Sequence, residues 1–226
     1  MINDPTRTPY ATPSALGVKP DARLSQAFLT QAFAWMFAGL LLTAAVSYYV
    51  AGSERMLQIA NDYMLLIVIA QFALVMVISG AINKISATVA LGLFFIYAAS
   101  VGLFIGALVL AVYPAASVAQ AFLSASAMFG GAAIYGAVTK RSLASMGGFL
   151  VMGLIGLIAV GFLNWFLRSD GLNLVISIAG IVIFAALTAY HVQRIQNGDL
   201  ASLYGSMEKG AVIGALSLYM TFLNLF

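Results

Sequence analysis

Residues 184–226 read FAALTAYHVQRIQNGDLASLYGSMEKGAVIGALSLYMTFLNLF, and this C-terminal stretch decides the fold. Two apolar segments flank a polar connector. His191, the only histidine of the chain, ends the first segment, and Thr221 and Asn224 interrupt the second. Polar groups within a membrane span are costly and are often functional, so we expect the function to be decided where the two segments meet.

The composition of the whole chain indicates that its solvent is lipid. Of the 226 residues, 63% are hydrophobic and 8% are charged, and the mean hydropathy is +1.03. An ordinary soluble protein has roughly 25% charged residues. A backbone inside a bilayer must satisfy its own hydrogen bonds, and apolar runs of about twenty residues do so as helices. The predicted class is therefore an all-α polytopic membrane protein.

Seven apolar segments follow one another along the chain. Gly52-Ser53, Tyr113-Pro114 and Ser169-Asp170-Gly171 mark turns between them. Because the connections are short, consecutive helices should pack antiparallel in one bundle. The seven predicted transmembrane helices cover residues 27–51, 63–82, 85–112, 117–138, 146–167, 172–193 and 209–226.

The two ends of the chain differ in character. Residues 1–23 are polar and hold four of the five prolines, which predicts a proline-rich cytoplasmic tail before a transmembrane domain of residues 24–226. No apolar segment begins before Leu24, so no cleavable signal peptide is expected. The last segment is short and reaches Phe226 without a polar flank, which suggests a truncated C-terminus.

The basic residues predict the orientation in the membrane. Eight of the ten lie in the tail and in alternate connections, and the other two lie on the opposite side. The eight are Arg7, Lys19, Arg23, Lys84, Lys140, Arg141, Arg194 and Lys209; the two are Arg55 and Arg168. Lysine and arginine accumulate on the cytoplasmic side, so we predict a cytoplasmic N-terminus and, with seven spans, an external C-terminus. This distribution also explains the net charge of +3 without nucleic-acid binding.

Small and polar residues recur on one face of the last predicted helix. Gly210, Gly214, Ser217, Thr221 and Asn224 are spaced by three or four residues, and the remaining faces are apolar. This stripe predicts a helix that is central in the bundle and faces protein or water. Two interpretations remain open, because the stripe could fix the packing through hydrogen bonds between helices or could line a conduit.

Catalytic and metal-binding chemistry have few candidate residues. The chain has no cysteine and one histidine, and no Asp or Glu lies inside a predicted span. His191 is either an ordinary interfacial histidine that reaches water or a functional titratable group. A serine nucleophile would lack a carboxylate to orient this histidine, and no HExxH, P-loop or GxSxG motif is present. We therefore expect neither an enzyme nor a bound cofactor or metal.

Three segments carry a family resemblance: TAYHVQRI (188–195), ALSLYMTFLNLF (215–226) and FGGAAIYGAVTKRSLASMGGFLVMGLIGLIAVGFLNWF (129–166). Together they resemble the Bax inhibitor-1-like family, the transmembrane Bax inhibitor motif proteins. The resemblance extends from the first span to Phe226. It implies seven helices with the last one central, residence in a bacterial inner membrane or a eukaryotic endomembrane, and a pH-sensitive calcium leak.

The resemblance also implies specific site residues. Relatives carry one aspartate in the sixth span and another in the seventh, and the hydrogen-bonded pair forms a pH switch coupled to a basic residue near the third span. The matching positions here are His191 and Thr221, so both aspartates are replaced, while Lys84 matches the basic position. Ser217 and Asn224 complete the channel and gating candidates.

Two functions of different classes follow. The first is a leak or channel for calcium or another cation, with gating altered by the replaced aspartates. The second is a regulatory or structural membrane subunit that does not transport and binds another membrane protein or complex. The lipid bilayer is the expected partner in both cases.

Overall fold

The structure is a computed structural model that describes the backbone of residues 22–226 and the side chains from Gln26 onward. Every regular element in this part of the chain is a helix. The chain divides into two compact units. The first unit contains the chain up to Ala115 together with Arg194–Leu216, and the second contains Ala116–Gln193 together with Ser217–Phe226.

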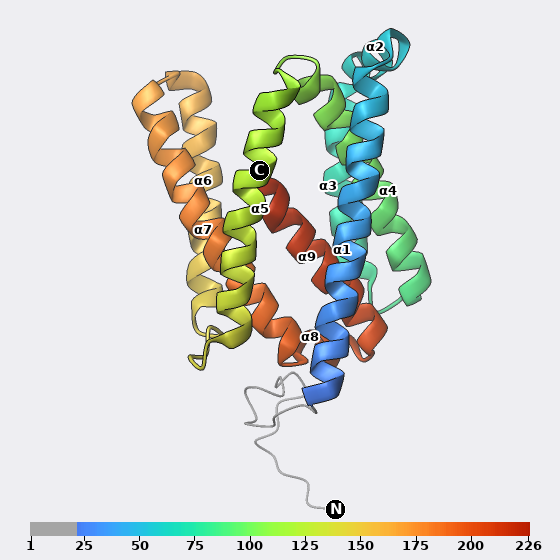
Figure 1. Cartoon of the computed structure of the whole chain (residues 1–226), viewed down its shortest axis with the longest axis vertical. Helices are drawn as coiled ribbons and strands as arrows, with labels where there is room; N and C mark the ends of the chain where they lie inside the picture. The colour runs from blue at the N-terminus through green and yellow to red at the C-terminus, as the bar shows by residue number, and fades with distance from the viewer. Residues whose placement is uncertain (1–21) are drawn as a thin grey trace, which may run out of the picture. The chain divides into compact units, whose positions relative to one another are not determined.

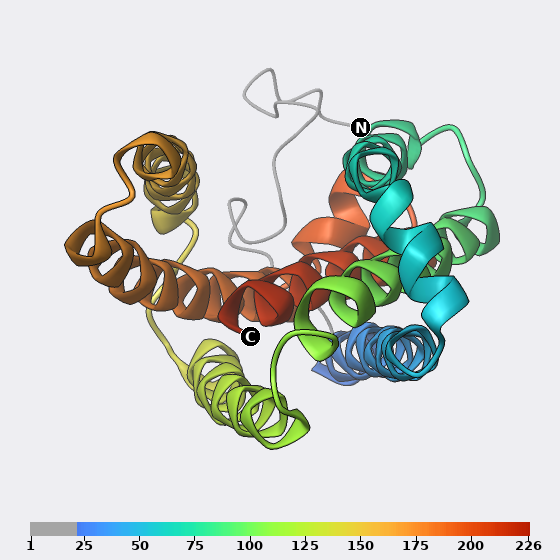
Figure 2. The same cartoon turned by 90° about the horizontal axis from the view of Figure 1, so that it is seen from above.

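The first unit begins with helices from the N-terminal half of the chain. They are α1 (Ala22–Ala51), α2 (Glu54–Asp62), α3 (Met64–Ala81), α4 (Ala87–Ile105) and a π-helical extension of α4, η1 (Gly106–Leu110). Contacts connect α4 to both α1 and α3, and Figure 2 shows α4 running between these two helices.

Small residues and hydroxyl groups join α1 to α4. A Cβ atom at Gly102 would lie 2.8 Å from the carbonyl oxygen of Thr43, so the two backbones approach each other directly. The hydroxyl of Thr43 donates to the Ala98 carbonyl oxygen at 2.9 Å, and that of Ser47 donates to the Gly102 carbonyl oxygen at 3.0 Å. In lipid, close backbone approach and hydrogen bonds between helices supply the association that the hydrophobic effect cannot.

The second unit contains α5 (Ala115–Val138), α6 (Met146–Leu167) and most of α7 (Asp170–Gln196). α6 and α7 form an antiparallel hairpin (Figure 1). Asn164 is buried at its turn, where its amide donates to the Asn173 side-chain oxygen at 2.6 Å and its own oxygen accepts from the Ser169 backbone N–H at 3.0 Å. The tight turn therefore leaves this buried amide satisfied.

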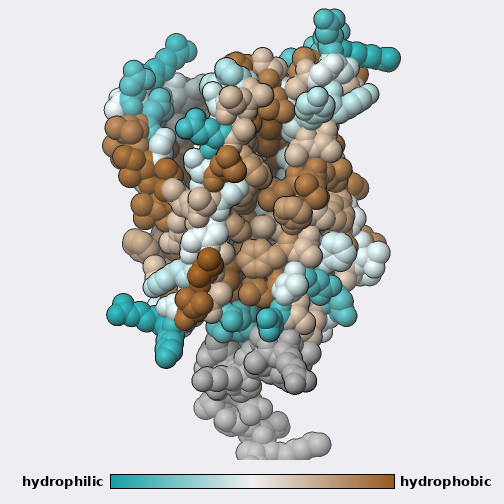
Figure 3. Space-filling view, in the orientation of Figure 1, coloured by the Kyte–Doolittle hydropathy of each residue, from teal (hydrophilic) through white to brown (hydrophobic). Residues whose placement is uncertain are grey.

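Six helices within residues 22–226 are long and apolar enough to cross a membrane: α1 from Gln26, α3, α4 with η1, α5, α6 and α7. Apolar side chains cover the middle of the α6–α7 hairpin, and hydrophilic side chains lie at both ends of it (Figure 3). This is the distribution expected of helices that face hydrocarbon between two polar interfaces.

The chain ends in α8 (Asp199–Tyr204) and α9 (Met207–Leu225). α9 has 19 residues and is therefore about 28 Å long, close to the thickness of a bilayer core. Glu208 and Lys209 lie in its first turn, and it is less apolar than the six spans, yet residues 210–216 are all buried. A helix surrounded by protein needs no apolar surface toward lipid, which explains this composition.

The predicted all-α polytopic fold with an enclosed last helix is thus confirmed. The predicted spans agree with the helices to within a few residues, apart from the first, which begins at Ala22, and the sixth, which ends at Gln196. The predicted cytoplasmic tail of residues 1–23 falls almost entirely outside the described residues. The short helices α2 and α8 were not predicted.

Candidate functional site

Thr221 lies in the part of α9 that belongs to the second unit. Its side chain is 4% exposed, and its hydroxyl donates to the Leu218 carbonyl oxygen in the preceding turn at 3.0 Å. The neighbouring Phe222 packs edge-on against Phe129 and Phe122 of α5, with ring centroids 5.5 Å and 5.3 Å apart. Thr221 is therefore a buried hydroxyl on a helix held in place by aromatic contacts.

The other two polar residues of the α9 stripe are less enclosed. Ser217 is half-buried, and Asn224 is exposed near the end of the helix. The Asn224 amide donates to the Met220 carbonyl oxygen of its own helix at 2.8 Å. The stripe thus changes from buried to exposed toward the C-terminus.

The glycines of the stripe lie in the first unit and are in close contact with protein. A Cβ atom at Gly210 would lie 2.9 Å from the Ala201 nitrogen and from the Phe28 ring, and one at Gly214 would lie 2.9 Å from Ile195. α9 is therefore packed against α1, α7 and α8 along its small-residue face. The prediction that this face is turned toward protein is confirmed for these two glycines.

His191 is half-buried on α7 and belongs to the same unit as Thr221. Its ring lies 5.4 Å from that of Tyr190, with the two planes tilted by 58°. An imidazole in this setting can donate and accept hydrogen bonds.

Lys84 belongs to the first unit, in the turn between α3 and α4, and it is exposed. The ammonium group of Lys209, at the start of α9, donates to the backbone carbonyl oxygen of Asn83 at 3.4 Å. Two predicted cytoplasmic lysines therefore lie at the same end of this unit.

Negative charge is scarce in the second unit, which contains His191 and Thr221. The only acidic residue of the second unit is Asp170, which is exposed at the start of α7. Within residues 22–226, no three His, Asp or Glu side chains come together in a group that could hold a metal ion. The groups offered at the two predicted positions are thus a hydroxyl and an imidazole.

Two of the buried polar residues that were not predicted lie near the C-terminal end of α7. Gln193 is 8% exposed and forms two hydrogen bonds with the connector between α5 and α6: its amide donates to the Arg141 carbonyl oxygen at 2.8 Å, and its oxygen accepts from the Leu143 N–H at 2.7 Å. Asp199, at the start of α8, is 4% exposed. Gln193 follows His191 by two residues in the quoted motif. Because it stands next to Arg194 at the end of a helix, its sequence context is the same as that of an ordinary exposed residue at the membrane interface.

Comparisons with known proteins find one matching family model and several relatives. Residues 25–226 match the family model described as "Inhibitor of apoptosis-promoting Bax1". The chain is 38% identical over 215 residues to inner membrane protein YbhL of Escherichia coli (strain K12), covering 92% of this chain and 91% of YbhL. It is 40% identical over 200 residues to a protein of Deinococcus radiodurans, covering 88% and 86% of the two chains, and 36% identical over 205 residues to YrjE of Lactococcus lactis, covering 88% and 87%.

The family match spans all the described helices, including the α6–α7 hairpin and the enclosed α9. The predicted family resemblance is therefore confirmed, and the chain belongs to the Bax inhibitor-1 family of membrane proteins.

Proposed function

We propose that this chain is a cation leak pathway of the Bax-inhibitor type that follows α9 and passes calcium only slightly. The observation that carries the proposal is that α9, which has the length of a span but is less apolar than the six candidate spans, is also enclosed by protein, with Thr221 buried on its stripe. Polar groups on a span commonly mark ion pathways, because burying them without a function is unfavourable.

The gating that we propose for this pathway differs from the gating expected of relatives that carry two aspartates. Relatives are expected to carry aspartates where His191 and Thr221 stand here, and neither replacement supplies a fixed negative charge to attract calcium. In the proposal the oxygen atoms of Ser217 and Thr221 line the pathway, Asn224 lies at its outer end, and His191 sets its electrostatics. The proposal assigns the chain no catalysis and no cofactor.

The proposed location is the inner membrane of a bacterium, as the name of YbhL states for that relative. The proposed orientation has the N-terminus in the cytoplasm and the C-terminus outside. The hydrogen bond from Lys209 to the turn that holds Lys84 supports this orientation, because it brings two basic residues to one end of the first unit.

A flux assay on purified protein in liposomes tests the proposal. We expect potassium efflux above that of protein-free liposomes and a much smaller calcium efflux. Thr221→Val removes the hydroxyl without changing the side-chain volume and should lower the potassium efflux severalfold. Thr30→Val makes the same chemical change at an exposed position of α1 and should leave the efflux unchanged. If no cation leaves the liposomes faster than without protein, the proposal is wrong.

One observation favours a second function, a subunit that binds another membrane protein and does not transport. Among the side chains that the structure describes, every buried nitrogen and oxygen atom has a hydrogen-bond partner, as Thr221 does within its own helix. Such groups are used for packing and do not need an ion. Copurification in mild detergent distinguishes the two functions. A stoichiometric partner that is lost on deleting residues 1–23 would support the subunit, and clean protein without a partner would contradict it.

A further inference from the structure

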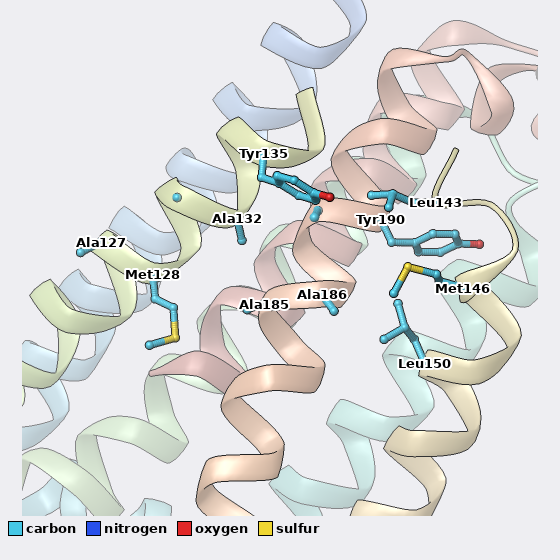
Figure 4. A pocket seen from close by; sticks show the side chains of 12 residues that line it. Ala127, Met128, Ala132, Tyr135, Leu143, Met146, Leu150, Ala185, Ala186 and Tyr190 are labelled. Carbon is cyan, nitrogen blue, oxygen red and sulfur yellow. The ribbon is translucent and has the colours of Figure 1, made fainter. Parts of the chain in front are cut away.

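The second unit contains a cavity of about 440 Å³ between α5, α6 and α7. Alanine, methionine and leucine side chains form most of its wall, and two tyrosines, Tyr135 of α5 and Tyr190 of α7, also line it (Figure 4). An apolar wall with a few polar groups at one end is typical of a site for a ligand of the same polarity.

The cavity exists because α5 and α7 are in contact at one point and separate beyond it. At Gly136 the helices touch, and a Cβ atom there would overlap the backbone of Ala189. At Gly131, which lines the cavity, a Cβ atom would meet nothing within 4 Å. The side chains that face this gap, including Ala132, Ala185 and Ala186, are too short to fill it.

The cavity is open to the exterior of the protein. Tyr135 is 52% exposed, and Met128 and Met146 on its wall are also exposed. On α5 the cavity is lined from Ala127 to Tyr135, eight residues apart, so it extends about 12 Å along the helix. In a membrane protein this depth lies among acyl chains, so a hydrocarbon chain is the molecule available to fill it.

Positive charge is held beside one end of the cavity. Lys140 and Arg141 are exposed in the connector between α5 and α6. The two hydrogen bonds of the buried Gln193 fix the backbone of this connector at Arg141 and Leu143, and Leu143 is itself part of the cavity wall. The basic pair therefore has a fixed place next to the apolar cavity.

We propose that this cavity binds an anionic phospholipid, with one acyl chain between α5 and α7 and its headgroup at Lys140 and Arg141. The combination of charge and apolar space selects this occupant, because a zwitterionic lipid would fill the cavity but gain nothing from two cations. Each basic side chain near a membrane surface strengthens the attraction for an anionic headgroup. Tyr135 lies where amphipathic rings meet the interface. The inference does not depend on the proposed leak.

Native mass spectrometry of the full chain in mild detergent tests the inference. The probes are phosphatidylglycerol and phosphatidylcholine with identical acyl chains, and the measured quantity is the affinity of the first bound lipid. We expect tighter binding of phosphatidylglycerol. Lys140→Gln with Arg141→Gln should lower that affinity roughly tenfold or more. Arg55→Gln with Arg168→Gln removes the same charge elsewhere and should not change it.

A pair of glycines tests the cavity itself. Gly131→Leu places a side chain in the cavity and should reduce binding of both lipids severalfold. Gly130→Leu makes the same change at the adjacent residue, which has equal space but does not line the cavity, and should leave binding intact. At neither position would an added Cβ atom meet another atom within 4 Å. Equal affinity for the two lipids, or equal effects of the two glycine variants, would overturn the inference.

Discussion

At the scale of single residues, Gln193 is the clearest example of a side chain whose role only the structure shows. Its side chain is buried and forms two hydrogen bonds with the backbone of the connector between α5 and α6. The connector carries the basic pair Lys140 and Arg141, so a residue of α7 determines where these charges lie. Gln193 is a positioning residue for that end of the second unit.

Replacing Gln193 should therefore destabilise the protein. Gln193→Met keeps the length of the side chain but leaves the Leu143 N–H, which is buried, without its partner. An unpaired buried group costs about 1–3 kcal/mol. Thermal unfolding in detergent measures the loss, and Gln120→Met, at an exposed position of α5, is the matched control. Equal melting temperatures for the two variants would contradict the role assigned to Gln193.

The sequence could identify His191 and Thr221 as special positions because polar groups stand out within apolar segments. It could not identify Gln193, which lies near Arg194 at the end of a helix where polar residues are ordinary. Nor could it identify the cavity, whose existence depends on how far α5 and α7 separate beyond Gly136. Spacing along one helix contains no information about that distance.

At the scale of elements, the contact between α1 and α4 shows how helices associate without a hydrophobic driving force. Gly102 and Gly106 allow the two helices to approach closely, because Cβ atoms at both positions would lie within 3 Å of α1. η1 begins at Gly106, and Cβ atoms at that residue would lie 2.7 Å from the Ser47 carbonyl oxygen.

Gly102→Val should force α1 and α4 apart. The new side chain overlaps Thr43 and Val46, and the hydrogen bond from Ser47 to the Gly102 carbonyl oxygen would be strained. Overpacking of this kind costs about 1–3 kcal/mol. Gly92→Val, on the same helix with open space around it, should be close to neutral when both are compared by thermal unfolding. An unchanged melting temperature for Gly102→Val would contradict this prediction, because it would show that the α1–α4 interface relaxes around the new side chain.

The long helices could be predicted from hydropathy because each is a membrane-length apolar run. α2 and α8 could not, since they have 9 and 6 residues and lie in polar connections. α2 does carry a local signal, because the Ser53 side chain accepts from the Met56 N–H and so caps the helix. α9 was predicted as the seventh apolar segment, and its polar stripe predicted that it is enclosed.

At the scale of the whole molecule, the orientation that we predict in the membrane rests on the distribution of the basic residues. The absence of cysteine from the chain makes this prediction easy to test. In intact cells, a membrane-impermeant maleimide should label Arg55→Cys and Arg168→Cys. Lys84→Cys and Lys140→Cys should be labelled only after permeabilisation. The opposite pattern would reverse the proposed orientation, and labelling of Lys84→Cys and Lys140→Cys on opposite sides would change the number of crossings.

The central claim is that the pathway along α9 has lost the carboxylate pair that would draw in calcium and respond to pH. The replaced positions can be restored by His191→Asp with Thr221→Asp. His191→Asn with Thr221→Asn provides side chains of the same shape without charge. Two close carboxylates share a proton and one pKa rises, so any calcium attraction they restore should fall as the pH drops through that pKa.

Calcium efflux from liposomes as a function of pH is the most direct test of this claim. The unmodified protein should show a slight efflux that hardly changes with pH, and the asparagine variant should resemble it. The aspartate variant should show a larger efflux that declines on acidification. A strong, acid-sensitive calcium efflux from the unmodified protein would contradict the account.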